Sequence, residues 1–406
     1  MSRSRRIAES LGLRRSIVGV LSMAVLVGMG ERMAERFLPV YLVALGAGQL
    51  WPGFLQAIDS GASALYSYPG GWLAERLGVK RALMVFDLVA LAGYGIVIAV
   101  PSWPAVVAGS LLFISWSAVS LPGTMGLIAK SLPSDRQVMG VSMHSLVRRL
   151  PRAVGPILGG LFIDAWGIET GIRLAFVVAA AMAVVALVLQ QVLIERDAPA
   201  AGLGAPSANP WRMFRSFSPA LRNLFVADVL IRFCEQIPYA YVTIWCMSEV
   251  AGERTARVSA TDVGWLTAIE MTTAMLCYIP VARWADRGGK KPFVLVTFVN
   301  FTLFPALLFF SRSFEMLALA FFVRGLKEFG EPTRKALILQ LAPAERTASA
   351  FGAYYLFRDG IITLAAIGGA WLWRADPGLN LGAAFGCGVL GTLWFWRFGR
   401  DLTKES

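Results

Sequence analysis

Charged side chains occur inside apolar segments of this sequence, where they can exchange protons or bind polar ligands. Residues 28–42 read GMGERMAERFLPVYL, and four ionisable residues interrupt this apolar stretch: Glu31, Arg32, Glu35 and Arg36. In a helix the two glutamates share one face, and the two arginines share another face about 100° away. Arg32 and Glu35 can also pair at i, i+3. We therefore expect a helix with an ionisable face in apolar surroundings.

The same pattern occurs again in the second half of the chain, where Arg232 and Glu235 repeat the spacing of Arg32 and Glu35. A carboxylate in surroundings of low dielectric can take up a proton near neutral pH, although a neighbouring arginine opposes this. One interpretation is that Glu35 or Glu235 takes up a proton and frees an arginine. The alternative is an internal ion-pair network that joins helices and never meets a substrate.

Two further apolar segments carry arginines that need partners. Arg148, Arg149 and Arg152 lie in one of them, and Arg358 and Asp359 lie in the other. An excess of guanidinium groups favours a carboxylate or phosphate on the ligand, held through bidentate hydrogen bonds. We expect the four arginines to bind an anionic group of a substrate and Asp359 to join the glutamates in proton coupling. In the alternative interpretation the arginines only bridge helices.

Residues 324–338, RGLKEFGEPTRKALI, carry charges that can neutralise one another within a single helix. Three acid–base pairs stand at i, i+4: Arg324–Glu328, Lys327–Glu331 and Glu331–Lys335. This spacing predicts a mainly structural role for these charges, with a kink at Pro332.

Motifs for enzymatic chemistry do not occur in the sequence. It has neither H-E-x-x-H nor G-x-S-x-G, and His144 is the only histidine. We therefore expect no catalytic residues, no metal site and no cofactor.

The composition is that of a polytopic membrane protein. Of the 406 residues, 56% are hydrophobic and 16% are charged, and the mean hydropathy is +0.61. A bilayer span takes roughly 20 residues, so the length suits about twelve helices. They are predicted near residues 16–44, 51–74, 81–101, 104–130, 137–165, 171–194, 220–248, 259–283, 292–311, 314–341, 346–373 and 378–397.

Charge is unevenly distributed among these predicted spans. The sixth, ninth and twelfth have uncharged interiors, and the third carries only Asp87. A charge that faces lipid near the midplane costs about 2.5–3.5 kcal/mol or more. We therefore expect the charged helices to surround a polar cavity, while every third helix supports them from outside.

Most of the basic residues fall in one set of alternate loops and in the two termini. This asymmetry predicts that both termini are cytoplasmic, in a plasma (inner) membrane crossed many times. It also accounts for much of the net charge of +12, which therefore gives no indication of nucleic-acid binding.

The chain divides into two similar halves. PGTMGLIAKSLPSDR at residues 122–136 matches PTRKALILQLAPAER at 332–346, with both prolines in register. An Ala-, Gly- and Pro-rich linker separates the halves. We predict an N-terminal six-helix half over residues 1–195, a cytoplasmic linker over 196–219 and a C-terminal six-helix half over 220–406. Parallel halves imply a pseudo-two-fold axis along the membrane normal.

Two motifs contain glycines at positions where helices can turn or pack closely. The first follows the second predicted span as GGWLAERLGVKR and recurs as ARWADRGGKK. The second is Gly-Pro-x-x-Gly-Gly in the fifth span. Their residues are Gly71, Glu75, Arg76, Gly78, Lys80, Asp286, Arg287, Gly289 and Lys290 in the first motif, and Gly155, Pro156, Gly159 and Gly160 in the second.

With these motifs the sequence resembles the major facilitator superfamily of secondary transporters, and in particular its twelve-helix drug/proton antiporter branch. The resemblance covers essentially the whole chain. It implies an all-α membrane fold of two parallel six-helix bundles that work by alternating access. It also implies that the first motif is a cytoplasmic gating latch and that the second lets the fifth helix kink and pack closely.

We therefore expect a proton-coupled transporter that exports a small amphipathic or anionic organic compound. Its partners would be that substrate, protons and the lipid bilayer, and the protein would be a monomer. The alternatives are proton-coupled uptake of an organic anion and a non-transporting membrane sensor.

Overall fold

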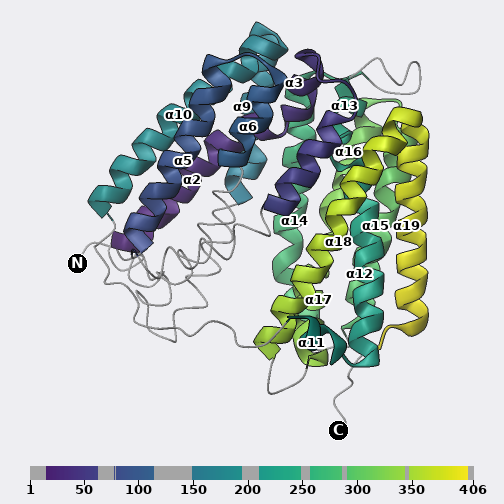
Figure 1. Cartoon of the computed structure of the whole chain (residues 1–406). Coiled ribbons are helices and arrows are strands. Elements are labelled where there is room, and N and C mark those ends of the chain that lie inside the picture. Colours follow the sequence, from purple (N-terminus) through teal and green to yellow (C-terminus); the bar gives the residue numbers. More distant parts are fainter. Residues whose placement is uncertain are drawn as a thin grey trace. The chain divides into compact units, whose positions relative to one another are not determined.

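The computed structural model describes residues 15–62, 77, 79–113, 149–193, 210–247, 257–285, 290–342 and 347–400. Throughout these residues every regular element is a helix (Figure 1). This confirms the all-α fold class that the sequence predicts. The number of membrane spans stays a prediction, because several predicted spans lie partly outside the described residues.

The chain forms two compact units. Unit 1 comprises Met1–Ala47, Gly61–Leu203 and Ala260–Gly264, and unit 2 comprises Gly48–Ser60, Gly204–Ser259 and Trp265–Ser406. Two short segments therefore belong to a different unit from the residues on either side of them. Residues 48–60 belong to unit 2, and residues 260–264 belong to unit 1. The division into halves over 1–195 and 220–406 stays a prediction.

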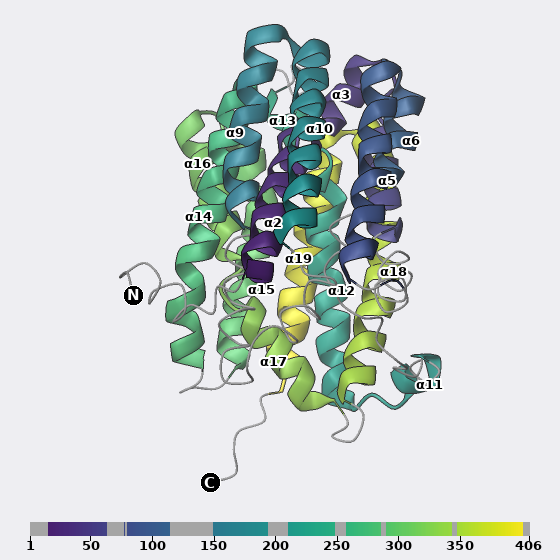
Figure 2. The same cartoon turned by 90° about the vertical axis from the view of Figure 1, so that its left-hand side faces the viewer.

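Unit 1 is a bundle in which α2 packs along α9 and α10, while α5 packs along α6 and α10 (Figure 2). Tyr94 of α5, Phe113 of α6 and Phe176 of α10 meet in its core, with ring centroids 5.1–5.8 Å apart. The described helices are α2 (Arg15–Glu35), α3 (Leu38–Ala44), α5 (Val79–Ala99), α6 (Trp103–Phe113), α9 (Arg149–Trp166) and α10 (Ile168–Leu193).

Two glycines let the backbones of α9 and α2 approach each other closely. A Cβ at Gly155 would lie 2.8 Å from the Cβ of Arg32, and a Cβ at Gly159 would overlap the carbonyl oxygen of Met33. Pro156 lies between them, inside α9. This contact needs residues without a side chain, which is the role of small residues in membrane helix packing.

The opposite side of the same segment meets the first turn of α14 (Ala260–Ala285). A Cβ at Gly160 would lie 2.5 Å from the carbonyl oxygen of Ala260. The carboxylate of Asp164 accepts hydrogen bonds from the backbone N–H groups of Ala260 and Thr261, at 3.0 and 2.9 Å. Asp164 thereby satisfies N–H groups that a helix N-terminus leaves without partners.

Unit 2 contains the remaining helices, and α12 packs along α15, α18 and α19. Residues 51–60 are also helical and belong to this unit. The others are α11 (Pro210–Arg215), α12 (Pro219–Tyr239), α13 (Val242–Met247), α14 beyond its first turn, α15 (Lys291–Phe310), α16 (Phe314–Leu326), α17 (Glu331–Leu341), α18 (Thr347–Ala375) and α19 (Pro377–Phe398).

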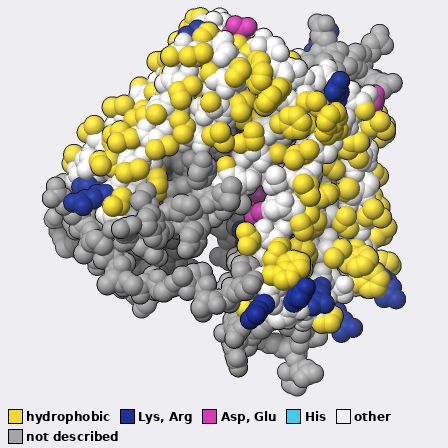
Figure 3. All heavy atoms as spheres, viewed as in Figure 1, with side chains coloured by type: hydrophobic (Ala, Val, Ile, Leu, Met, Phe, Trp, Pro, Cys, Tyr) yellow, Lys and Arg dark blue, Asp and Glu magenta, His cyan; other side chains and the backbone are white. Residues whose placement is uncertain are grey.

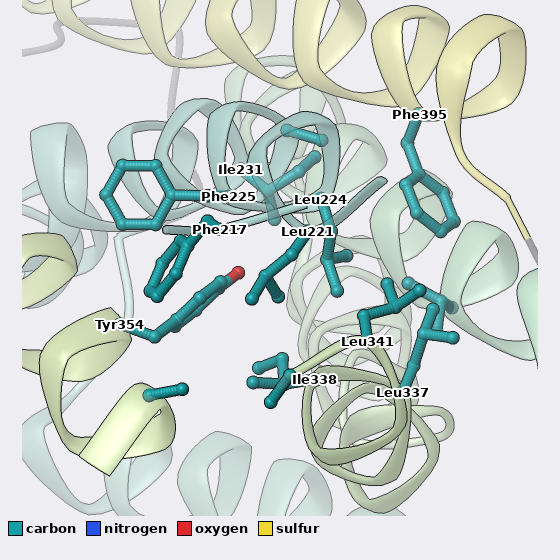
Figure 4. Close-up of a cluster of buried hydrophobic side chains, with 14 of the residues drawn as sticks. Phe217, Leu221, Leu224, Phe225, Ile231, Leu337, Ile338, Leu341, Tyr354 and Phe395 are labelled. Carbon is teal, nitrogen blue, oxygen red and sulfur yellow. The ribbon is translucent and has the colours of Figure 1, made fainter. Parts of the chain in front are cut away.

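A large apolar cluster lies at one end of unit 2 (Figure 4). Leu221 and Leu224 of α12 pack there with Ile338 of α17, Tyr354 of α18 and Phe395 of α19. The cluster also includes Met213 of α11 and Phe298 of α15. Because these side chains are almost fully buried, the cluster holds six helices together by the hydrophobic effect and dispersion.

Three predicted spans are broken rather than continuous. The first is interrupted at residues 36–37 between α2 and α3, the seventh at 240–241 between α12 and α13, and the tenth at 327–330 between α16 and α17. Proline stands in the first turn of α3 and of α17, and Pro238 lies in the last turn of α12. Proline removes a backbone donor and clashes with the preceding turn, which explains why the helices end there.

Four of the described helices are long and apolar enough to cross a membrane: Lys80–Ala99, Ile168–Leu193, Lys291–Phe310 and Pro377–Phe398. They correspond to the third, sixth, ninth and twelfth predicted spans, which are the ones with few interior charges. Hydrophobic side chains cover much of the described surface on the face that Figure 3 shows, as expected for a membrane protein.

We predict that Gly159→Ala lowers the stability of the protein by about 2 kcal/mol, because the added methyl group overlaps the backbone of α2. Gly368→Ala in α18 is the matched control, since a Cβ there meets nothing within 4 Å. The control should leave stability unchanged or raise it slightly, because alanine favours a helix over glycine. Thermal unfolding of the purified variants in detergent measures both effects, and equal shifts would contradict the prediction.

Candidate functional site

Ten charged side chains form one alternating series of ion pairs inside unit 2. We call this series the ion-pair chain. It joins α12, α14, α16, the turn that follows α16, α17 and α18. In order its members are Asp359, Arg358, Asp228, Arg334, Glu331, Arg232, Glu235, Lys327, Glu270 and Arg324.

Arg334 lies at the centre of the ion-pair chain and is 1% exposed. Its guanidinium group pairs with Asp228 of α12 and, at 2.6 Å, with Glu331 in its own helix. The hydroxyl group of Tyr354 in α18 donates to Asp228 at 2.9 Å. These contacts bring α12, α17 and α18 together around one buried arginine.

Arg232 continues the chain from α17 back to α12. Its guanidinium group lies 3.1 Å from the carboxylate of Glu331 and 2.7 Å from that of Glu235. The pair that the sequence predicts at i, i+3 is therefore present, but Arg232 is shared with a second carboxylate from another helix. The ring of Phe301 in α15 lies 5.2 Å from the same guanidinium group, within the range of cation–π attraction.

Lys327 extends the chain from α12 to α14. Its Nζ atom lies 2.8 Å from Glu235 and 3.2 Å from Glu270. Arg324 ends the chain, with its Nε atom 3.2 Å from Glu270. Lys327 belongs to the turn between α16 and α17, so the break in that span places its amino group between two carboxylates.

Aromatic rings surround the Arg324 end of the chain. The guanidinium carbon lies 4.7 Å from the ring centre of Phe304, 5.7 Å from that of Phe321 and 5.6 Å from that of Tyr239. Aromatic faces attract a cation and exclude water from it. The rings thus help to stabilise Arg324, which is buried and pairs with Glu270 at this end of the ion-pair chain.

The Asp359 end of the ion-pair chain lies on α18 and is partly exposed at the surface of the described residues. Arg358 pairs with Asp359 at 2.7 Å, and its guanidinium carbon lies 4.1 Å from the ring centre of Tyr355. Nη1 of Arg358 is buried, makes no hydrogen bond and lies 3.6 Å from Asp228. The side chain of Asp359 is 39% exposed, whereas the other carboxylates of the chain are buried or nearly so.

The charges of the ion-pair chain cancel. Five carboxylates and five cations give a formal charge of 5 − 5 = 0. An isolated buried ion costs several kcal/mol even after the protein relaxes, so unpaired charges would not persist at these positions. Each carboxylate between the two ends lies between two cations, and the desolvation of each ion is offset by its neighbours.

The expectation that the charges of residues 324–338 satisfy one another is wrong for Arg324 and Lys327. Arg324 and Lys327 pair with carboxylates of α14 and α12, while Glu331 pairs within the segment with Lys335, as expected, at 3.9 Å and also with Arg334 at 2.6 Å. The i, i+4 spacing predicts a continuous helix, but residues 327–330 form a turn that redirects the side chains. Sequence reasoning therefore missed Asp228, Glu270, Arg324, Lys327, Glu331 and Arg334 as members of the site.

A smaller ion-pair group lies in unit 1, at the end of α2. Arg32 donates to Glu35 at 2.6 Å and lies 3.8 Å from the carboxylate of Glu31. One arginine thus serves two carboxylates, as the cations do within the ion-pair chain. Glu31 is buried, Glu35 is half-buried, and Arg36 follows at the break before α3.

The arginines predicted to bind substrate have different positions. Arg149 is half-buried and Arg152 is exposed, both in the first turn of α9. Arg358 is an interior member of the ion-pair chain, so its charge is already balanced by a carboxylate. Arg148 lies outside the described residues.

The gating motif is described only at its basic end. Lys80 donates to the carbonyl oxygen of Gln191 near the end of α10, at 2.8 Å. Lys291 donates to the carbonyl oxygen of Trp396 near the end of α19, at 2.9 Å, while Lys290 precedes α15. A cation at a helix C-terminus is favourable, and the same contact occurs once in each unit. The other motif positions lie outside the described residues: Gly71, Glu75, Arg76, Gly78, Asp286, Arg287 and Gly289.

Comparison with known families gives a match over most of the chain. The family described as Major Facilitator Superfamily matches residues 20–254 and 224–404. The quinolone resistance protein NorA of Staphylococcus aureus is 27% identical over 216 residues, which cover 51% of this chain and 54%, about half, of that protein. The multidrug resistance protein MdtG of Klebsiella pneumoniae is 24% identical over 359 residues, which cover 84% of this chain and 83% of that protein.

Solved structures share the fold at low sequence identity. The nucleoside transporter NupG superposes with a TM-score of 0.77 at 15% identity, over 95% of this chain and 100% of that chain. A POT family transporter in complex with 5-aminolevulinic acid gives 0.76 at 13% identity, over 95% of each chain. At these identities the likeness shows the fold alone.

We predict that Arg334→Leu lowers the stability of the protein by about 3 kcal/mol or more, because it removes one partner of buried ion pairs. The remaining cations near Asp228 are 3.6 and 3.8 Å away, too far to replace the lost hydrogen bond. Lys335→Leu is the matched control, since Lys335 is a half-exposed neighbour 3.9 Å from the same glutamate, Glu331. Thermal unfolding in detergent should show a large shift for the first variant and a small one for the second.

Proposed function

The chain belongs to the Major Facilitator Superfamily of secondary transporters, and we propose that it uses a proton gradient to export a small amphipathic or anionic organic compound. The observation that carries this proposal is the neutral ion-pair chain inside the apolar helices of unit 2. Ionisable groups within a membrane are costly, and in transporters they serve proton relays and substrate sites. The family and the structural neighbours are transporters rather than enzymes.

An alternating chain of ion pairs can accept a proton without leaving a buried cation alone. Arg232 lies between Glu331 and Glu235, so it keeps one carboxylate when the other is neutralised. Lys327 likewise lies between Glu235 and Glu270. A proton at Glu235 would therefore weaken the contact between α12 and the turn after α16 while both cations stay paired. Such a shift of partners between helices can bias a two-state transporter.

Asp359 is the point at which we propose that protons enter the ion-pair chain. Among the five carboxylates of the ion-pair chain, Asp359 has the most exposed side chain. Within the described residues its cationic partner is Arg358. When Asp359 is neutral, Arg358 can turn its unbonded Nη1 toward Asp228, which is 3.6 Å away. Arg334 would then share Asp228 with Arg358. Protonation of Asp359 on α18 would in this way alter the contact between Asp228 of α12 and Arg334 of α17.

In unit 1 we propose the same role for Glu35. Its partner Arg32 also lies 3.8 Å from Glu31, which can keep the arginine paired when Glu35 takes up a proton. Glu35 and Glu235 occupy equivalent places in the two halves of the sequence. We therefore propose that both take part in coupling, together with Glu31, Arg32, Arg36 and Arg232.

The substrate class rests on the relatives and on arginines in unit 1. Two relatives are named for resistance to quinolones and to multiple drugs, which favours export of amphipathic compounds by this chain. Arg149 and Arg152 lie in the first turn of α9, and we propose that they and Arg148 bind an anionic group of the substrate. Arg358 would contribute when its carboxylate partner is neutralised.

We propose a plasma (inner) membrane location with both termini in the cytoplasm, and a monomer as the working form. The support lies in unit 2, where more exposed basic side chains stand at the end at which α12 begins and α19 ends. They are Arg212, Arg215, Arg222, Arg397 and Arg400, against Arg257, Arg312 and Arg374 at the other end.

We predict that Glu35→Gln and Glu235→Gln each abolish transport driven by a pH gradient, because neither amide can take up a proton. Everted membrane vesicles with an acidified lumen and a fluorescent quinolone as the probe measure this transport. Glu315→Gln is the matched control, since Glu315 is an exposed glutamate at the start of α16. Both site variants should insert in the membrane at the level of the unchanged protein, and unchanged proton coupling in both would reject the proposal.

The same vesicles distinguish the alternative functions. An exporter accumulates the probe when the lumen is acidified, whereas a proton-coupled uptake transporter expels it. Quinolone binding to the purified protein without any flux in liposomes would instead indicate a non-transporting sensor.

We predict that Asp359→Asn reduces proton-driven accumulation but preserves counterflow, in which substrate exchanges for substrate without net proton movement. The reason is that the amide keeps the size of the side chain but cannot release Arg358 in response to a proton. In a double-mutant cycle with Arg358→Gln, the loss of proton-driven accumulation in the double variant should be smaller than the sum of the two single losses, because paired residues give non-additive effects. Additive losses in the cycle, or equal loss of counterflow, would exclude the proposed entry point.

A further inference from the structure

The segment that leads into unit 2 forms an ordered corner at one end of the helices. It consists of α11 and the first turn of α12. Met213 and Phe217 are buried in the apolar cluster of unit 2. The ring of Phe214 lies 4.8 Å from that of Phe357 in α18 and 5.0 Å from that of Phe225 in α12. The inner face of α11 is therefore fixed against unit 2 by apolar side chains.

Hydrogen bonds fix the direction of the corner. Ser218 accepts from the backbone N–H of Leu221, as an N-cap of α12, and donates to the carbonyl oxygen of Leu341 in α17. Arg222 donates to the carbonyl oxygen of Arg215 at 2.5 Å, which satisfies one of the acceptors that the end of α11 leaves open. These hydrogen bonds fix the backbone that carries the arginines of the corner.

The outer face of α11 combines an aromatic ring with positive charge. Trp211 is 50% exposed, and the guanidinium carbon of Arg215 lies 5.3 Å from its ring centre. Arg212 and Arg222 are exposed as well. Residues 198–227 contain no Asp or Glu, so no acidic residue within this stretch of sequence balances these charges.

The neighbouring end of α19 has the features of a membrane interface. Trp396 is 61% exposed beside exposed Arg397, and Lys291 of α15 donates to the carbonyl oxygen of Trp396. Tryptophan concentrates where the apolar core of a bilayer meets the headgroups. In Figure 3, Lys and Arg side chains gather at the end of unit 2 that carries α11 in Figure 1, next to hydrophobic side chains.

From these observations we infer that the corner is a binding site for the headgroup of an anionic phospholipid. Arg212 and Arg215 would bind the phosphate group, because a guanidinium group offers paired donors that match phosphate oxygens. Trp211 would lie at the level of the glycerol and headgroup, where an amphipathic ring is favoured. The site rests on the membrane location of the chain and is independent of proton coupling.

The test compares lipids added to the purified protein in detergent. Phosphatidylglycerol should raise the midpoint of thermal unfolding in a saturable manner, and phosphatidylcholine of the same acyl chains should raise it much less. The double variant Arg212→Gln with Arg215→Gln should weaken the apparent affinity for phosphatidylglycerol roughly twenty-five-fold, since each basic group near an anionic surface contributes about five-fold. Both side chains are exposed, so this variant should fold like the unchanged protein.

Matched controls separate the proposed site from general charge effects. The double variant Arg312→Gln with Arg374→Gln removes two exposed arginines from the opposite end of unit 2 and should keep the response to phosphatidylglycerol. Inorganic phosphate at equal concentration should not reproduce the shift, because the site is proposed for a lipid headgroup. Equal responses to the two lipids, an unchanged response of the Arg212/Arg215 variant, or a full shift with inorganic phosphate would each overturn the inference.

Discussion

The constraint on which unit 2 depends is that a charge buried in apolar surroundings must have a compensating charge beside it. Ten ionisable side chains meet this constraint by alternating in sign across five helices and a turn. The pairs are not independent, because each interior ion is shared between two partners. The positions of α12, α17 and α18 are therefore linked electrostatically as well as by the apolar cluster, whereas α14 is linked to the other helices through Glu270 and its pairs with Lys327 and Arg324.

Local features of the site could be predicted from the sequence, and contacts between helices could not. The pairs Arg32–Glu35 and Arg232–Glu235 are both present, because i, i+3 spacing places their side chains together in any helix. Lys327 was expected to pair with Glu331 within a continuous helix. Its actual partners lie on α12 and α14, since the turn over residues 327–330 changes the direction of the side chain. Such a turn depends on packing that a single sequence does not reveal.

The fold class could be predicted because composition and the length of apolar segments depend on the membrane rather than on tertiary detail. Among the described helices, the four that are long and apolar enough to cross a membrane are those expected from their few interior charges. The breaks within the first, seventh and tenth predicted spans were harder to foresee. The sequence has a proline near each break, but a proline can kink a membrane helix or end it, and neighbouring helices decide which occurs.

A chain of ion pairs offers a transporter something that isolated pairs cannot. When one carboxylate of an isolated buried pair is neutralised, its cation is left alone at a cost of several kcal/mol. In the ion-pair chain, neutralising Glu235 leaves Arg232 beside Glu331 and Lys327 beside Glu270. The excess charge is then spread over several groups, and the helices that lose a contact can move. A neutral alternating chain therefore combines a stable resting arrangement with cations that stay compensated after one carboxylate is neutralised, which is what the proposed proton-coupled conformational change requires.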